Sequence, residues 1–170
     1  MYKATFMKFL IKIYMLVATT FCLAQNSIPK ALEKLNNKTV PYLTVEQLQS
    51  KPEVVLLDAR ETKEFNVSHI KNAINVGFDY FDKNAISVKI PNKNANIIVY
   101  CSIGVRSEKI GEKLLKMGYK NVFNLYGGIF EYKNNGGKVI DNKGVETNNV
   151  HTFNKEWSHY LKKGNKIYED

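Results

Sequence analysis

The chain has 170 residues, a length that suits one domain with a full hydrophobic core and short extensions. Hydrophobic residues make up 44% of it, including ten tyrosines and nine phenylalanines, which excludes a chain that is disordered throughout. The formal net charge of +9 invites a nucleic-acid interpretation, but the lysines are scattered and no run of five basic residues occurs. We therefore expect a solvated basic surface and no nucleic-acid partner.

The N-terminal segment, residues 1–24, is expected to be a secretory signal peptide. Three lysines and no acidic residue precede an apolar core over residues 13–23, and Ala24 supplies a small residue for cleavage. The apolar core spans about eleven residues, short of the roughly 20 that a membrane span needs. We therefore expect an exported protein, periplasmic or extracellular, with no stable membrane association after cleavage. A retained membrane anchor is the alternative.

Cleavage would change both the charge and the cysteine count. It removes three lysines and no acidic residue, so the formal charge falls from +9 to +6. It also removes Cys22, which leaves Cys101 as the one cysteine of the mature chain. An unpaired cysteine in an exported protein suggests a reactive thiol or an intermolecular partner. No intramolecular disulfide can form, and we expect no metal and no cofactor.

The mature chain is expected to alternate strands and helices. Short apolar, β-branched runs predict strands, and apolar residues at spacings of three and four predict helices. The expected elements, in chain order, are a linker or short helix over 25–37, a short strand over 40–43, a helix capped by Thr44 with Gln47, a strand over 54–57, a helical turn over 61–65, a strand over 74–76, helix and loop over 78–88, a strand over 97–100, a helix over 106–118, a strand over 122–125, a turn at 127–128 and a final short helix.

This order predicts an α/β fold. It is a three-layer sandwich in which helices flank a central, mainly parallel sheet of about five strands. The domain is expected to span residues 38–137, with a C-terminal extension over 138–170 that packs on or near it. In the extension we expect a hairpin around residues 142–144 and a short amphipathic helix over 154–164. A monomer is expected.

Cys101 lies where an apolar strand ends and an amphipathic helix begins. The first amides of a helix have no intrahelical partner and, with the helix dipole, favour an anion such as a thiolate. Gly104 allows the loop to curl with its amides inward, and Arg106 adds a fixed positive charge. We therefore interpret Cys101 as a nucleophile. An inert buried cysteine is the alternative.

These residues resemble the rhodanese family of sulfurtransferases. The resemblance covers roughly residues 38–137, and its motifs are specific in combination and in order. They are Asp58-Ala59-Arg60 with Glu64-Phe65, His69-Ile70 with Ala73 and Asn75, the C-x-x-G-x-R-S loop, Gly118-Tyr119, and Asn124-Leu125-x-Gly127-Gly128.

The resemblance implies that Cys101 takes a sulfane sulfur from a small anionic donor such as thiosulfate, holds it as a persulfide, and passes it to a thiol or cyanide. It implies that Arg106 binds the donor, that Asp58 and Arg60 form a supporting pair, and that His69 makes a structural polar contact. The persulfide would be cradled by the amides of the active-site loop, which consists of Ser102, Ile103, Gly104, Val105, Arg106 and Ser107.

Three other functions are alternatives to sulfur transfer. Phosphatases and arsenate reductases with a cysteine cradle need C-x5-R, whereas the spacing from Cys101 to Arg106 is C-x4-R, a smaller ring. A non-catalytic binding module is a second alternative, although such domains often lack the cysteine. A thiol redox role is a third, and it would need a second thiol from another molecule.

Overall fold

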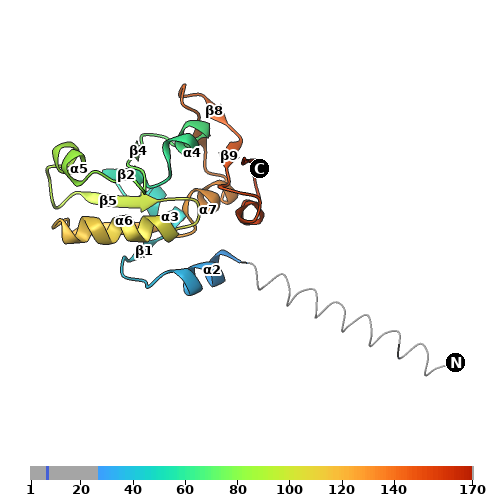
Figure 1. Ribbon diagram of the computed structural model, residues 1–170, viewed down its shortest axis with the longest axis horizontal. Coiled ribbons are helices and arrows are strands. Elements are labelled where there is room, and N and C mark those ends of the chain that lie inside the picture. The colour runs from blue at the N-terminus through green and yellow to red at the C-terminus, as the bar shows by residue number, and fades with distance from the viewer. Residues whose placement is uncertain (1–6, 8–26, 170) are drawn as a thin grey trace.

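The computed structural model describes Met7 and residues 27–169, so the expected signal peptide lies outside the described residues except for Met7. The centre of the fold is a five-stranded sheet in which all neighbouring strands are parallel (Figure 1). This confirms the predicted α/β fold. The strands, in their order across the sheet, are β1 (Tyr42–Leu43), β6 (Asn121–Leu125), β5 (Asn96–Tyr100), β2 (Val54–Asp58) and β4 (Ile74–Asn75).

Helices cover both faces of this sheet. Successive side chains of a strand point to opposite faces, and in this sheet both faces carry apolar side chains that the helices bury. In β5, Ile98 and Tyr100 belong to the same hydrophobic cluster as residues of α3 (Val45–Ser50) and α7 (Gly128–Asn134). Ile97 and Val99 belong to a second cluster, with residues of α5 (Lys83–Lys89) and α6 (Val105–Lys116). The strand is therefore buried between two helical layers.

The segment before the sheet forms a helix, α2 (Ile28–Leu35), which is the second of the two possibilities for residues 25–37. Its first turn holds a proline, which is tolerated there because that amide has no intrahelical acceptor. Ile28 and Leu32 are buried in the core. The backbone amides of Asn37 and Thr39 donate to the carboxylate of Glu108, which fixes this segment to α6.

The C-terminal extension packs on the domain through several pairings. The expected hairpin is present: β7 (Val139–Ile140) pairs antiparallel with β8 (Glu146–Thr147), and also with β3 (His69–Ile70). Two further strands, β9 (Asn149–His151) and β10 (Asn165–Ile167), form a parallel pair. β9 packs against α4 (Thr62–Val67), and Figure 1 shows this part of the chain beside the carboxyl edge of the sheet.

The prediction of an amphipathic helix over residues 154–164 is wrong. Only a single 3-10 turn, η1 (Trp157–Tyr160), forms there. Asn134 of α7 explains why the turn ends, because its Nδ2 donates to the carbonyl of Tyr160 and its Oδ1 accepts from the amides of Lys162 and Lys163. After this turn the backbone is extended and continues into β10. We call residues 152–164 the C-terminal loop.

Other element boundaries follow the sequence closely. Thr44 and Gln47 form the predicted capping box of α3. The helix expected over 106–118 is observed at Val105–Lys116. The strand expected over 40–43 is reduced to β1, and its pairing with β6 is extended by a hydrogen bond from the amide of Asn124 to the carbonyl of Pro41.

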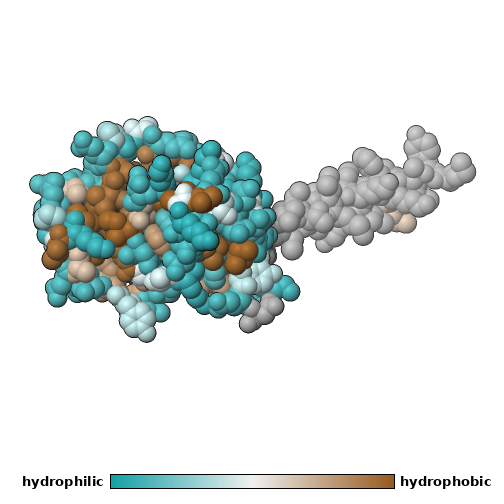
Figure 2. All heavy atoms as spheres, turned by 90° about the horizontal axis from the view of Figure 1, so that it is seen from above, coloured by the Kyte–Doolittle hydropathy of each residue, from teal (hydrophilic) through white to brown (hydrophobic). Residues whose placement is uncertain are grey.

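Among residues 27–169 and Met7, no helix combines the length and the hydropathy that a membrane span requires. The face seen in Figure 2 carries apolar patches separated by polar side chains. Exposed large hydrophobic side chains include Tyr80, Val88, Val145 and Phe153. One of these, Phe153, lies in the C-terminal loop.

Candidate active site

The thiol of Cys101 is buried at the carboxyl end of β5, where the loop into α6 begins. The amide of Gly104 donates to its Sγ at 3.2 Å, and the hydroxyl of Ser107 lies 3.5 Å from the same sulfur. The first amides of α6 have no intrahelical acceptors and add the positive end of the helix dipole. The amide of Gly104 and the first amides of α6 stabilise negative charge on sulfur, either as a thiolate or on the outer atom of a persulfide.

The conformation of Gly104 directs its amide at the sulfur. Its φ is 114°, in the left-handed region that side chains disfavour. Its carbonyl accepts from the side-chain amides of Asn36, at 2.9 Å, and Asn124, at 2.8 Å. Asn124 also accepts from the hydroxyl of Ser107 at 2.8 Å. These two asparagines hold the loop through the carbonyl of Gly104. Neither was predicted as a site residue. For Asn124, the sequence signal that could have indicated this role is its place in the Asn-Leu-x-Gly-Gly motif.

The first turn of α7 supports the backbone of the same loop. The amides of Ile129 and Phe130 donate to the carbonyls of Cys101 and Ser102, at 2.9 and 3.1 Å. Gly128 permits this approach, because its φ is +56° and a Cβ atom there would lie 2.3 Å from the carbonyl oxygen of Cys101. The Gly-Gly pair thus fixes the position of Cys101 as well as making a turn.

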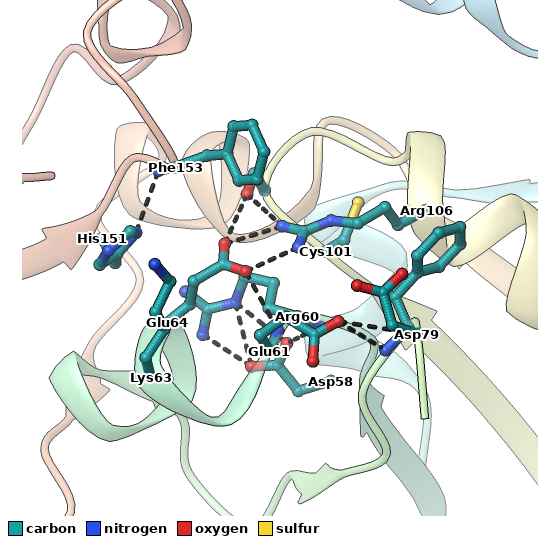
Figure 3. A network of polar contacts seen from close by, with 12 residues as sticks. Asp58, Arg60, Glu61, Lys63, Glu64, Asp79, Cys101, Arg106, His151 and Phe153 are labelled. Carbon is teal, nitrogen blue, oxygen red and sulfur yellow. Dashed lines mark hydrogen bonds and ion pairs between the residues drawn. The ribbon is translucent and has the colours of Figure 1, made fainter. Parts of the chain in front are cut away.

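Arg106 is held by a carboxylate that the sequence analysis did not assign to the site. Its Nη1 and Nη2 donate to the two carboxylate oxygens of Glu64, at 2.6 and 2.7 Å, and Nη2 also donates to Ser102 Oγ at 3.1 Å (Figure 3). The Glu64 side chain is only 1% exposed. Its burial would raise the pKa of Glu64, but the hydrogen bonds and charge of Arg106 outweigh burial, so the pKa lies below its usual value. Glu64 is therefore ionised and neutralises Arg106.

The predicted supporting residues lie beside this network and do not contact the thiol. Asp58 and Arg60 form a fully buried pair, with Nη2 and Oδ2 2.6 Å apart, and Arg60 also donates to the carbonyl of Ser68. Nδ1 of His69 lies 3.0 Å from the carbonyl of Phe65, and the two rings are stacked. Their contacts are those of structural residues.

A cavity of about 150 Å³ opens beside the thiol. The active-site loop and α6 form one side of it, and the C-terminal loop contributes the other with Phe153 and Trp157. The ring of Phe153 lies over the guanidinium of Arg106, 5.3 Å from its central carbon. The residues that line the cavity are Cys101, Ser102, Ile103, Val105, Arg106, Phe153 and Trp157.

His151 anchors the C-terminal loop through a hydrogen bond to the backbone of Phe153. Its Nδ1 accepts from the amide of Phe153 at 3.1 Å, which places the ring proton on Nε2, a buried atom with no hydrogen-bond partner among the described residues. Burial lowers the pKa of His151, with Lys63 and Arg60 adding to the effect and Glu64 and Glu169 opposing it. The folded protein therefore holds this imidazole neutral.

Acidification is expected to destabilise the protein through His151. Because its folded pKa lies below the ordinary value of 6.5, the contribution to stability is complete above pH 6.5 and is lost as the pH falls below it. We expect His151→Asn, whose Oδ1 can still accept from Phe153, to reduce the fall in Tm between pH 7.5 and 5.5. Thermal unfolding of both proteins at the two pH values checks this, and an equal fall in both would contradict it. His69 and His159 are retained in both.

Among the described residues, no group of three or more histidine, cysteine, aspartate or glutamate side chains is placed to hold a metal ion. The site holds one cysteine, the free Cys101, whose sulfur accepts a hydrogen bond from the amide of Gly104.

The fold and the site together define an α/β protein that holds a buried, free cysteine on a loop at the carboxyl edge of a parallel sheet. The sequence model described as the rhodanese-like domain matches residues 43–135, more than half of the chain. The chain belongs to this family.

Several known proteins are similar to this chain in sequence or in structure. A tRNA uridine(34) hydroxylase from Photorhabdus laumondii is 38% identical over 102 residues, which are 56% of this chain and 29% of that one. A thiosulfate sulfurtransferase from Pseudomonas aeruginosa superposes with a TM-score of 0.57 at 24% identity, over 64% of this chain and 21% of that one. A rhodanese-related protein from Thermoplasma volcanium gives a TM-score of 0.51 at 26% identity, over 59% and 97%. The chain spans less than a third of the length of the hydroxylase and the sulfurtransferase.

Proposed function

We propose that this protein is a sulfurtransferase in which Cys101 carries a sulfane sulfur as a persulfide. The observation that carries the proposal is the position of the thiol, 3.2 Å from the amide of Gly104 at the N-terminus of α6. A persulfide needs donors for its outer sulfur and no metal or organic cofactor. The loop supplies such donors in a protein of the rhodanese-like family.

The reaction consists of two displacements on sulfur. In the first, the thiolate of Cys101 attacks the outer sulfur of thiosulfate, the S–S bond of the donor breaks, and sulfite leaves with the bonding electrons. In the second, an acceptor such as cyanide attacks the outer sulfur of the persulfide, thiocyanate leaves, and the thiolate is restored. Charge balances in each step, and neither requires an external proton donor. The buried donors around Sγ hold the charge in both resting states.

The hydroxylase relative suggests a different reaction, hydroxylation of uridine 34 in tRNA, for the protein that bears that name. More than two thirds of that relative has no counterpart in this chain. The cysteine loop, by contrast, lies within the residues matched by the family model, and its hydrogen bonds to Cys101 and Arg106 support sulfur transfer. We therefore place sulfur transfer first.

Intact mass measurement tests the proposal. The mature protein, incubated with thiosulfate and separately with 3-mercaptopyruvate, is expected to gain one sulfur, about 32 Da, that cyanide or a thiol removes. Protein first alkylated at Cys101 with iodoacetamide is the control and should gain nothing. No gain from thiosulfate, from 3-mercaptopyruvate or from a singly charged thiosulfonate such as benzenethiosulfonate, with Cys101 still open to alkylation, would reject sulfur transfer in favour of the binding-module or thiol redox alternative.

We also propose that the protein is exported, as the order of charged, apolar and small residues in 1–24 suggests. N-terminal sequencing of the protein recovered from the cell envelope or the medium should begin at Gln25. A mature protein that begins at Met1 would support the retained-anchor alternative.

A further inference from the structure

We propose that the C-terminal loop is the specificity wall of the active site, and that it selects sulfur donors with an apolar, ring-sized carbon group and a single negative charge. This inference rests on the proposed function, because it names the class of donor that charges Cys101. It concerns Phe153 and Trp157, which lie beyond residues 43–135 matched by the family model.

The C-terminal loop is held in place by contacts at both of its ends and along its length. Its two ends are joined by the parallel pairing of β9 with β10, and the buried side chains of Val150 and Leu161 anchor it in the core. Asn134 of α7 holds its far side through three hydrogen bonds. Within the loop, Asn154 Oδ1 accepts from the amide of Trp157 at 3.0 Å. The two aromatic side chains are therefore presented to the cavity by a braced segment.

Phe153 is held in a conformation that its side chain disfavours. Its φ is 68°, in the left-handed region, which for a bulky residue is an outlier. The hydrogen bond from its amide to His151 maintains this conformation. Its ring nevertheless remains 51% exposed, so burial of the ring in the core does not account for the strain. Strained residues are concentrated at functional sites, and here the strain places an aromatic ring at the mouth of the cavity.

The charges around the cavity disfavour a small dianion. Arg106 gives two of its hydrogen bonds to Glu64, and its guanidinium carbon lies over the ring of Phe153. The ion pair of Arg106 with Glu64 has no net charge. The backbone amides of the active-site loop are then the groups that stabilise the negative charge of a donor. Thiosulfate would bring two negative charges beside Ile103, Val105 and the aromatic wall, and an unpaired charge is costly to transfer from water to such surroundings.

The size of the cavity suits an apolar ring. An apolar cavity of about 150 Å³ holds a benzene molecule in an engineered protein, and the cavity beside Cys101 has about the same volume. Phe153 and Trp157 offer ring faces and edges against which an aromatic group can pack. A donor of this kind is benzenethiosulfonate, in which a phenyl group replaces one charged oxygen of thiosulfate.

The loading step with this donor is balanced in the same way as with thiosulfate. The thiolate of Cys101 attacks the outer sulfur of benzenethiosulfonate, the S–S bond breaks, and benzenesulfinate leaves with the bonding electrons. The total charge of −2 is the same before and after, and no oxidant or reductant is consumed. The phenyl group stays in the cavity until the sulfinate departs.

Comparison of three donors in the full chain tests the proposal. Thiosulfate, methanethiosulfonate and benzenethiosulfonate differ only in the group on the inner sulfur, and thiocyanate formation with cyanide gives kcat/KM for each. We expect Phe153→Ala and Trp157→Ala to reduce the ratio of kcat/KM for benzenethiosulfonate to that for methanethiosulfonate by at least about tenfold. Tyr80→Ala, at a side chain that is 89% exposed and does not line the cavity, is the matched control and should keep the ratio.

The outcomes separate this inference from the proposed function. Transfer from all donors with an unchanged ratio in both loop variants would overturn the inference and leave the function standing. Absence of thiocyanate from every donor would overturn the function, and the inference with it. Phe153→Gly and Trp157→Leu provide second variants should an alanine variant fold poorly, because glycine accepts the positive φ and leucine keeps apolar volume without a ring.

Binding of the product gives an independent readout. Trp157 is the only tryptophan of the chain, so its emission reports on this cavity. Benzenesulfinate should change the emission of the wild-type full chain in a saturable way, with a dissociation constant at least about tenfold weaker in Phe153→Ala. Equal affinity in the two proteins would contradict a role for Phe153 in selecting the donor.

Discussion

Cys101→Ser is expected to reduce sulfur transfer to the rate measured without protein, a loss on the order of 10³-fold or more. A serine hydroxyl in this position can accept the hydrogen bond from the amide of Gly104 as the sulfur does, but it is neither ionised near neutral pH nor able to hold a transferable sulfur. The measurement is thiocyanate formation from thiosulfate or benzenethiosulfonate with cyanide as acceptor. No mass gain should occur at this position.

The fold of this variant should be unchanged, because Ser102 and Ser107 show that hydroxyls are accommodated in the same buried loop. Far-ultraviolet circular dichroism and a Tm close to that of the wild type check this point. Ser107→Ala is the matched control: it removes a hydroxyl 3.5 Å from the sulfur and leaves the nucleophile in place. It should therefore retain part of the activity. A Cys101→Ser protein that still transfers sulfur would end the assignment of Cys101 as the carrier.

The sheet and the loop could be predicted from sequence because both depend on local patterns. The β-branched runs of β2 and β5 and the apolar spacing of α6 are determined by neighbours within a few residues. The position of Cys101 between strand and helix follows from the same patterns. A parallel sheet then places it at the carboxyl edge, whatever the details of the tail.

The partners of the loop could not be predicted in the same way, because they come from distant parts of the chain. Glu64 lies 42 residues before Arg106, and Asn36 lies 68 residues before Gly104. Single charges and amides carry no periodic signal that would reveal such pairs. The donor-binding role that the resemblance implies for Arg106 must therefore be considered together with the carboxylate that already binds it.

The C-terminal loop illustrates a second limit. The spacing of Trp157, Tyr160 and Leu161 is helical, yet only η1 forms, since Asn134 takes the backbone groups that follow and β10 draws the chain back to β9. Tertiary contacts here override a local propensity. The lining of the cavity depends on this conformation, because a regular helix would present a different set of side chains to it.

Asp58→Asn is expected to cause the largest loss of stability, about 3–5 kcal/mol, because it leaves a buried guanidinium without its counter-charge. Both side chains of the pair are 0% exposed, and Asp58 accepts from Nε and Nη2 of Arg60 and from its backbone amide. Burial lowers the pKa of Arg60, but the charge and hydrogen bonds of Asp58 outweigh burial and raise it, so the arginine remains protonated at any working pH. Urea denaturation measures the loss.

The control is Glu146→Gln, which makes the same change from carboxylate to amide in an ion pair of 2.9 Å with Lys138. Both of those side chains are more than half exposed, so the expected loss is about 0–1 kcal/mol. Equal losses in the two variants would contradict the assignment of the Asp58–Arg60 pair as a buried support.

The same pair links stability to the active site. Asp58 ends β2, the amide of Ala59 donates to the carbonyl of Tyr100, and Tyr100 immediately precedes Cys101. Arg60 lies over the ring of Tyr100 as well. Asp58→Asn should therefore reduce sulfur transfer even at temperatures where the variant is folded, whereas the double variant Asp58→Asn with Arg60→Met, which removes the buried charge, should regain stability. A double variant that is less stable than Asp58→Asn alone would show that Arg60 supports the fold through its other contacts and not through charge pairing.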